Sequence, residues 1–405
     1  MTAEPVGFVF DPFADGFTDD PHPHYARLRD RAPVCRHPLG FWIVSRHADV
    51  AHLQRSAQSV DEQSLADVPE YKRDSAEMGK ANRMMAGLSM IDRDPPDHTR
   101  LRRLVAAAFI RRSVHALEPR IVDLVDEACD RLADAGRVDV VADLAFPLPF
   151  IVISELLGLP MIDGARLREL TGTLVRGLEP LPDPSLAAEI RTANAELTSM
   201  VSDMIAHRRT RPADDLITAL LRGDDHGDVL TPDELVAQVM LLYIAGHETT
   251  VNLIAGGLST LIRHPAQLAL LRTTPGLADN AVDEMLRYDS PVHLMRRITT
   301  TPMMFPDGVI PAGVFVTAAI AAANRDPRVF GPDADVPRID RADARRHLSF
   351  GAGIHHCIGA ALARLEARVV FTRFAARFPD AVVDETRWNG RINVRGPASL
   401  LVTVR

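Results

Sequence analysis

A single uninterrupted stretch in the second half of the chain constrains the fold more than any other feature. The run from Thr231 to His264 has no break after its start and predicts a helix of about 33 residues, roughly 49 Å long. Thr231 can serve as the N-cap, with Pro232 at the first helical position and Glu234 completing a capping box. Both flanks of the run are apolar, so we expect this helix to be buried in a large core.

The centre of the predicted helix reads Ala245-Gly-His-Glu-Thr-Thr250, which is costly in a buried segment. Gly246 destabilises a helix by about 1 kcal/mol relative to Ala, and a buried acid needs a partner or a function. Without a side chain, Gly246 would open a groove in which Thr249 could donate to a small ligand while Glu248 relays protons from water. Thr249 could equally bond back to the preceding turn of the helix. The residues alone leave both interpretations open.

A second unusual stretch, Phe350-Gly-Ala-Gly-Ile-His-His-Cys-Ile-Gly359, is a Gly-rich loop that leads into an apolar-periodic helix at about 358–374. Cys357 then stands at a helix N-terminus, where unpaired N–H groups and the helix dipole favour the thiolate. Glycines on both sides leave room for a flat ligand, which suits an axial thiolate ligand to haem iron. The alternatives are an inert buried cysteine and a zinc site that uses His355, His356 and Cys357.

Two further patterns pair charged residues at helical spacing. His98 and Arg102 are four residues apart, so they share a helix face and could hold a carboxylate such as a haem propionate. The alternative is an ordinary exposed basic helix. Glu284 and Arg287 are three apart, and such pairs are usually surface ion pairs of little energetic value.

The loop at 350–359, called the Cys loop below, resembles the haem-binding signature of the cytochrome P450 family. Three other patterns match further motifs of that family: the acid–Thr pair Glu248-Thr249, the Glu-x-x-Arg of Glu284 and Arg287, and the His-x-x-x-Arg of His98 and Arg102. The resemblance covers about 21–405 and implies one mainly helical, triangular domain over 1–405, with small β-sheets at one side. Residues 1–20 would form an N-terminal arm. The resemblance also makes Glu284–Arg287 a buried structural pair, Thr249 and Glu248 the oxygen-activating pair, and Cys357 the iron ligand. The residues that it implies as contacts of haem b are His98, Arg102, Ala245, Gly246, Arg296, Phe350, Gly351, His355, Cys357 and Gly359.

This resemblance implies a haem-thiolate monooxygenase that activates O₂ and hydroxylates or epoxidises a medium-sized lipophilic molecule, in bacterial secondary metabolism. The substrate is free or tethered to a carrier protein. Electrons would come from NAD(P)H through a ferredoxin and its reductase, and an arginine-rich face could steer this acidic partner. Its expected residues are Arg100, Arg103, Arg112 and Arg364. Two alternatives are an oxidase of the same fold that couples phenols or closes rings, and a haem carrier or sensor without turnover. The acid–Thr pair argues against the carrier.

The composition of the chain limits the partners and the cellular compartment that we expect for it. The net charge of −8 argues against nucleic acid as a partner. Three cysteines, Cys35, Cys129 and Cys357, lie far apart and form no disulfide framework. The acidic, Pro-interrupted N-terminus does not resemble a signal peptide, and no later run reaches about 18 apolar residues. We therefore expect a soluble, cytoplasmic protein with no membrane partner.

The substrate pocket is expected to have mainly apolar walls. They would come from the long central helix, the extended segment after Arg287, the loop at 65–90 and the hinge at 174–181. Long irregular loops are often lids or substrate walls, and disorder is the alternative for this one. The pocket residues expected are Leu88, Leu241, Leu242, Val292, His293 and Met295, with His293 as a polar contact.

Overall fold

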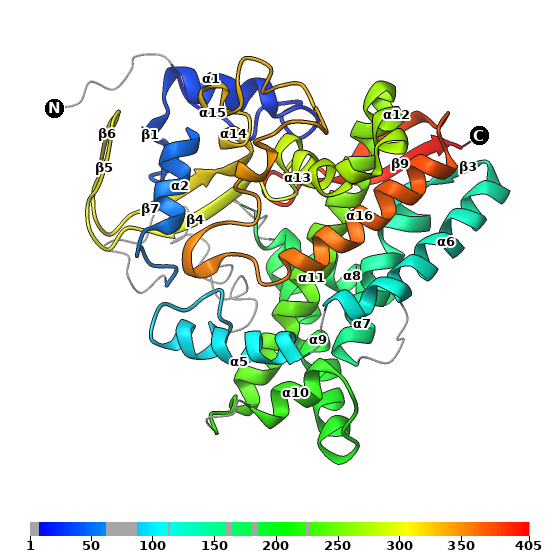
Figure 1. The fold of residues 1–405 in the computed structure, drawn as a ribbon. Helices are drawn as coiled ribbons and strands as arrows, with labels where there is room; N and C mark the ends of the chain where they lie inside the picture. The colour runs from blue at the N-terminus through cyan, green and yellow to red at the C-terminus, as the bar shows by residue number, and fades with distance from the viewer. Residues whose placement is uncertain are drawn as a thin grey trace.

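The computed structural model describes residues 8–61, 87–111, 114–158, 164–179, 185–223 and 227–404. The long helix predicted from the sequence is α11, Pro232–Arg263, with 32 residues. Its N-terminus has the predicted capping box, because the Thr231 side chain accepts from the Glu234 backbone and the Glu234 side chain accepts from Thr231. Most of its side chains are buried, and it runs through the centre of the molecule (Figure 1).

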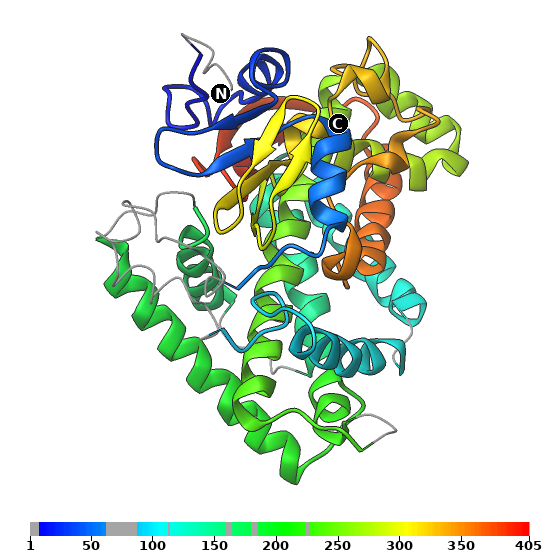
Figure 2. The same ribbon diagram turned by 90° about the vertical axis from the view of Figure 1, so that its left-hand side faces the viewer.

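Helices surround α11 on several sides because its apolar surface is not confined to one stripe. The longer helices besides α11 are α1 (His22–Arg31), α2 (His47–Arg55), α5 (Asp97–Arg111), α6 (Glu118–Ala135), α7 (Pro147–Leu157), α8 (Gly164–Arg176), α9 (Leu186–Thr210), α10 (Leu216–Arg222), α12 (Pro265–Thr273), α13 (Ala278–Tyr288) and α16 (Ala360–Arg377). Of these, α7, α9, α13 and α16 pack directly against α11. In Figure 2 the largest sheet lies toward one end of α11, and α9 and α10 lie at the other. Two helices of one turn each, α14 (Ile320–Ala323) and α15 (Pro327–Phe330), precede the Cys loop.

The strands form small sheets. They are β1 (Val34–Arg36), β2 (Trp42–Val44), β3 (Arg137–Asp139), β4 (Leu294–Ile298), β5 (Met303–Phe305), β6 (Gly308–Ile310), β7 (Phe315–Ala319), β8 (Val382–Trp388) and β9 (Pro397–Thr403). The four-stranded sheet has the order β1-β2-β7-β4, in which β2 and β7 are parallel and the outer pairs are antiparallel. A second sheet has the order β3-β9-β8, and β5 pairs with β6.

Several local features depend on contacts between separate parts of the chain. The Ser45 hydroxyl donates to the Pro33 carbonyl, and the N-cap residue of α2 is Arg46. β6 and β7 follow one another in sequence but belong to different sheets. The C-terminal hairpin consists of β8 and β9, and residues 392–395 lie in the turn between them. Within the described ranges, no helix is both long and apolar enough to cross a membrane.

Candidate active site

The Cys loop is fixed by backbone contacts before α16 begins. The backbone N–H of Cys357 donates to the Phe350 carbonyl at 2.8 Å, which closes the loop. Gly351 and Gly353 have φ angles of 71° and 73°, a conformation that favours glycine. A Cβ on Gly353 would lie 2.8 Å from the carbonyl oxygen of Gln54, so the loop is pressed against the end of α2. A side chain at this position would push the loop away from α2.

The Cys357 side chain is accessible, but its sulfur is surrounded mainly by protein atoms. Its side chain is exposed, yet burial is the largest influence on its thiol and raises the pKa. The backbone N–H of Gly359, which donates to the sulfur, and the positive charges of Arg102 and Arg364 act in the opposite direction. Gly359 is the N-cap of α16, so the sulfur lies at a helix N-terminus as expected. Within the described ranges, no three His, Cys, Asp or Glu side chains are grouped so that they could hold a metal ion between them, which gives the zinc alternative no support.

The centre of α11 is partly exposed, whereas the helix on either side of it is mostly buried. Ala245 is exposed, and Thr249, one turn later, is half-buried. The Thr249 hydroxyl donates to the Ala245 carbonyl at 2.8 Å, which is the back-bond weighed from the sequence. This bond uses the hydroxyl proton and leaves the oxygen able to accept from a ligand or water. The two interpretations of Thr249 are therefore compatible.

Gly246 has a different role from the one predicted. A Cβ on Gly246 would lie 3.2 Å from Cδ1 of Ile153 on α7, a tighter contact than side chains normally make. The missing side chain therefore lets α7 approach α11 and does not open a groove beside Thr249. This correction leaves Ala245 as the small residue whose surface is accessible.

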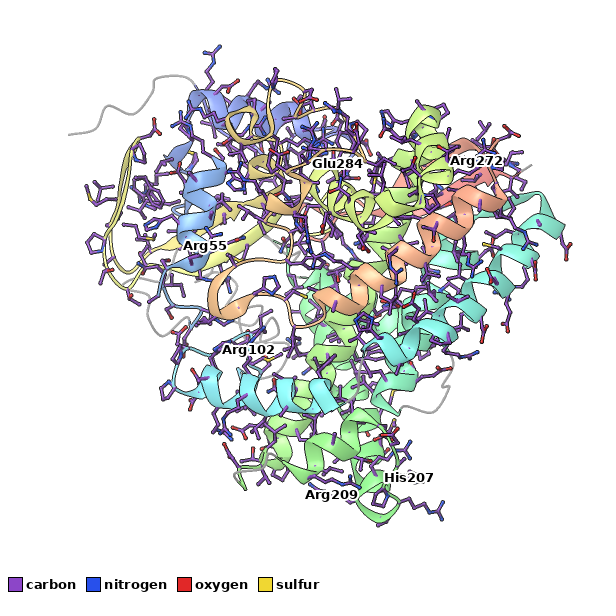
Figure 3. All side chains as sticks on the ribbon, viewed as in Figure 1. Arg55, Arg102, His207, Arg209, Arg272 and Glu284 are labelled. Atoms are coloured by element: carbon purple, nitrogen blue, oxygen red, sulfur yellow. The ribbon has the colours of Figure 1, made fainter. Side chains whose placement is uncertain are left out.

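Buried nitrogen atoms gather between α5 and the Cys loop. The rings of His98 and His355 lie 4.3 Å apart between centroids. Both nitrogens of His98 and Nε2 of His355 are buried and have no hydrogen-bond partner among the described residues. Arg102 donates to the carbonyl of His356 at 2.5 Å, and Figure 3 shows it between α5 and the loop. Such a cluster of donors needs an acceptor, and the carboxylates of haem fit this requirement.

The arginine of this cluster on β4 is Arg297, not Arg296 as predicted. Successive side chains of a strand point to opposite faces. Arg296 is exposed and its guanidinium lies 4.7 Å from the centre of the Phe315 ring. Arg297 is buried, and burial lowers its pKa to about 10. The charge of Arg297 lowers the pKa of His98. Burial lowers the pKa of His355 to about 3, and the charge of Arg297 is the second-largest cause of that shift. The prediction chose the wrong one of two adjacent arginines because the sequence pattern did not fix the register of the strand.

The Glu284–Arg287 pair is completely buried on α13. Arg287 donates to both carboxylate oxygens at 2.7 and 2.8 Å, and its other N–H groups donate to the carbonyls of Asn324 and Ala334. Arg341 is a third member, because its Nε donates to Glu284 at 3.1 Å. Sequence reasoning did not include Arg341 in this cluster. The cluster fixes α13 to the chain that leads into the Cys loop.

The residues expected in the substrate pocket differ in how deeply they are buried. Leu241 and Leu242 are buried on α11, and the carbonyl of Leu88 accepts from Gln238 of the same helix. Val292 and Met295 are half-buried. Most of the loop at 65–90 and part of the hinge at 174–181 lie outside the described residues.

His293 does not lie where it was predicted. Its ring is fully buried and its Nδ1 lies 3.3 Å from the Tyr25 hydroxyl, beside His22. Burial lowers the pKa of His293 well below its usual value. The residue therefore belongs to a packed cluster under α1 and is not the expected polar contact for a substrate.

Two polar residues with unusual environments were not identified from the sequence. Arg391, from the turn between β8 and β9, donates to Glu248 at 3.2 Å. Glu366 on α16 is buried, and its Oε1 has no hydrogen-bond partner in the described part of the chain. Arg391 had no detectable signal in the sequence. Glu366 interrupts the apolar period of α16, and that interruption was a signal that could have been used.

Burial raises the pKa of Glu366 to about 8, which predicts a pH dependence of stability. In the unfolded chain this carboxyl ionises near its usual value of 4.5, so the folded protein binds more protons between about pH 4.5 and 8. The free energy of unfolding should fall across this window, by at most about 1.4 kcal/mol per pH unit from this residue. Glu366→Gln should remove that slope, as urea denaturation at about pH 5 and pH 8 would reveal. Parallel curves for the two proteins would contradict the assignment.

Comparison with known proteins agrees with this geometry. The family model described as Cytochrome P450 matches residues 184–273 and 276–388. Cytochrome P450 107B1 of Saccharopolyspora erythraea is 41% identical over 408 residues, covering 96% of this chain and 96% of the relative. Vitamin D(3) 25-hydroxylase of Pseudonocardia autotrophica is 40% identical, covering 97% and 96%. The crystal structure of P450BioI with an acyl carrier protein ligated to hexadec-9Z-enoic acid has a TM-score of 0.87 and 30% identity, covering 96% and 99%. A loop with an accessible cysteine, a central helix with an acid–Thr pair and these full-length similarities lead to one conclusion: the chain belongs to the cytochrome P450 family and is a monooxygenase of that family.

Proposed function

We propose that Cys357 supplies the thiolate ligand of haem b and that the polar side chains between α5 and the Cys loop bind its propionates. Those side chains are His98 and Arg297, which are buried, and Arg102 and His355, which are half-buried. When bound, the haem supplies the activation of O₂ and the transfer of oxygen to the substrate. The observation that carries the proposal is that the unsatisfied nitrogens of His98 on α5 and His355 on the Cys loop lie together beside an accessible cysteine on that loop.

Residues of α11 would hold and move the protons that the reaction requires. Thr249 lies next to the exposed Ala245, and its oxygen can accept a hydrogen bond while its proton is held by the Ala245 carbonyl. Glu248 precedes it on the same turn, and its carboxylate can take up and release a proton. We assign Thr249 to holding a water or ligand proton and Glu248 to exchanging protons with solvent.

A difference spectrum of the dithionite-reduced protein with and without carbon monoxide tests the ligand assignment. A strongly red-shifted Soret band is expected because the thiolate is an electron-rich axial ligand. A band at the position typical of haem with a histidine ligand would exclude Cys357 as the thiolate ligand. Absence of haem would reject the proposed cofactor site as a whole.

Replacing Thr249 with Ala should separate electron consumption from product formation. Without the Thr249 hydroxyl oxygen, water beside Ala245 loses a fixed hydrogen-bond acceptor, and protons are no longer delivered from a fixed position. Electrons from NAD(P)H should then end in hydrogen peroxide instead of in product. We expect product per NAD(P)H to fall by about 10²-fold, the lower end of the contribution of positioned proton transfer. Thr249→Ser keeps the hydroxyl and serves as the control. Equal product per NAD(P)H in the Ala variant and the parent would contradict the assignment.

We further propose that the substrate is a medium-sized lipophilic molecule of secondary metabolism, free or carrier-bound, and that a ferredoxin delivers the electrons in the cytoplasm. Two relatives support the substrate class: one is named for vitamin D3, and another is crystallised with an acyl carrier protein. The apolar side chains of Leu241 and Leu242 on α11 agree with it. Titration of the ferric protein with vitamin D3, with free hexadec-9Z-enoic acid and with its carrier-bound form tests this class. A shift of the Soret band to shorter wavelength identifies a ligand that enters the haem pocket, and no shift with all three would reject these probes as substrate models.

A further inference from the structure

The turn at 389–396 is held tightly between three parts of the molecule. A Cβ on Gly396 would lie 2.1 Å from Oδ1 of Asn252, so the turn is in close contact with α11. Glu179, just after α8, accepts from the backbone N–H groups of Ile392 at 2.7 Å and Asn393 at 3.2 Å. The backbone N–H of His293 donates to the Asn393 carbonyl at 2.8 Å. The position of this turn is therefore fixed by contacts that do not involve Arg391.

Arg391 extends from this turn and bridges two helices. Its Nη1 lies 3.2 Å from Oε2 of Glu248 on α11, and its Nη2 donates to the carbonyl of Gly172 on α8 at 3.3 Å. Both side chains of the ion pair are about 15% exposed, so the contact is mostly shielded from water. One planar guanidinium thus holds the carboxylate of the proposed proton relay and a backbone atom of α8 at the same time.

The same ion pair forms part of the wall of a cavity of about 170 Å³. Its other lining residues include Arg168, Gly172, His247 and Asn252. His247 is 1% exposed, and neither of its ring nitrogens has a partner within the described ranges. Nδ2 of Asn252 is likewise buried and has no partner among those residues. A polar cavity with unsatisfied donors and acceptors is suited to hold water, and water in this cavity would lie next to Glu248.

We propose that Arg391 is a positioning residue for proton delivery, which fixes the orientation of the Glu248 carboxylate beside the water-holding cavity and couples that orientation to the position of α8. The inference rests on the proposed role of Glu248. Because one guanidinium makes both contacts, a displacement of α8 relative to α11 must lengthen one of them. A carboxylate held at the cavity can exchange protons with its water, whereas a released carboxylate loses its fixed geometry. Arg391 is not needed to anchor the turn, which Glu179 and Gly396 already hold.

Three variants of the holoenzyme separate these contacts. Arg391→Gln removes the charge, and Arg391→Lys keeps the charge but replaces two donor groups with a single ammonium that cannot reproduce the fork. Arg168→Gln is the matched control, because it removes a positive charge from the same cavity wall on α8, where Arg168 stacks on the ring of Phe146. NAD(P)H-supported O₂ consumption is measured in H₂O and D₂O with a saturating surrogate ferredoxin and reductase. Hydrogen exchange of the α8 amides is measured on the same proteins.

For Arg391→Gln we expect O₂ consumption to fall several-fold, the solvent isotope effect to increase, and exchange in α8 near Gly172 to become faster. Arg391→Lys should keep the isotope effect near that of the parent and still show faster exchange in α8. Arg168→Gln should leave the isotope effect unchanged. If Arg391→Gln leaves the isotope effect unchanged, or if Arg168→Gln raises it equally, the inference is overturned.

Glu248→Gln, measured in parallel, distinguishes failure of this inference from failure of the proposed function. A raised isotope effect in Glu248→Gln without one in Arg391→Gln would overturn only the role of Arg391. An isotope effect unchanged by Glu248→Gln would reject the relay assigned to Glu248, and the role of Arg391 with it.

Discussion

Replacing Cys357 with His is expected to abolish the red-shifted Soret band of the reduced, carbon monoxide-bound protein and all monooxygenase activity. Imidazole is a neutral ligand, so it cannot supply the electron density of a thiolate. The substitution leaves the rest of the loop in place, since the backbone N–H at position 357 still donates to the Phe350 carbonyl. We expect a variant that binds haem but shows the band of a histidine-ligated protein, with product formation below detection.

Cys35→Ser is the control for this experiment. Cys35 is half-buried on β1, which pairs with β2 at the edge of the four-stranded sheet. Its replacement should leave both the spectrum and the activity of the protein unchanged. A red-shifted band that persists in Cys357→His, or one that disappears in Cys35→Ser, would refute the assignment of Cys357.

The parts of the fold that could be predicted are those governed by local sequence rules. α11 has the predicted start because Thr231, Pro232 and Glu234 interact within one turn. It has the predicted end because His264-Pro265 interrupts the helix. The mainly helical fold with small sheets was likewise correct, as the similarity to a solved cytochrome P450 structure shows.

The errors concern contacts between residues far apart in sequence. Arg296 and Arg297 are adjacent, and only the pairing of β4 with β7 decides which of them points toward His98 and His355. Gly246 is explained by Ile153 on α7, a neighbour that no pattern around Gly246 indicates. Arg391 meets Glu248 only because the C-terminal turn folds over α11.

Glu284→Gln should destabilise the protein by about 3–5 kcal/mol. The Glu284 carboxylate accepts from Arg287, Arg341 and the backbone N–H of Arg338. Its replacement leaves the buried Arg287 guanidinium without a negative charge, whereas Arg341 keeps its ion pair with Asp333. The penalty is mainly that of the uncompensated cation and not the energy of one hydrogen bond. A shift of the urea midpoint at unchanged slope measures it.

An exposed ion pair of similar geometry provides the control. Arg120 donates to Glu155 at 2.8 Å, but both side chains are about 40% exposed, so Glu155→Gln should cost less than about 1 kcal/mol. Arg287→Lys tests the same cluster without removing its charge: the ammonium cannot donate to both carboxylate oxygens and to the carbonyls of Asn324 and Ala334, so an intermediate loss is expected. Equal losses for Glu284→Gln and Glu155→Gln would mean that burial does not amplify the cost of breaking the pair. A large difference would place the source of stability in the buried charge cluster that joins α13 to the chain leading into the Cys loop.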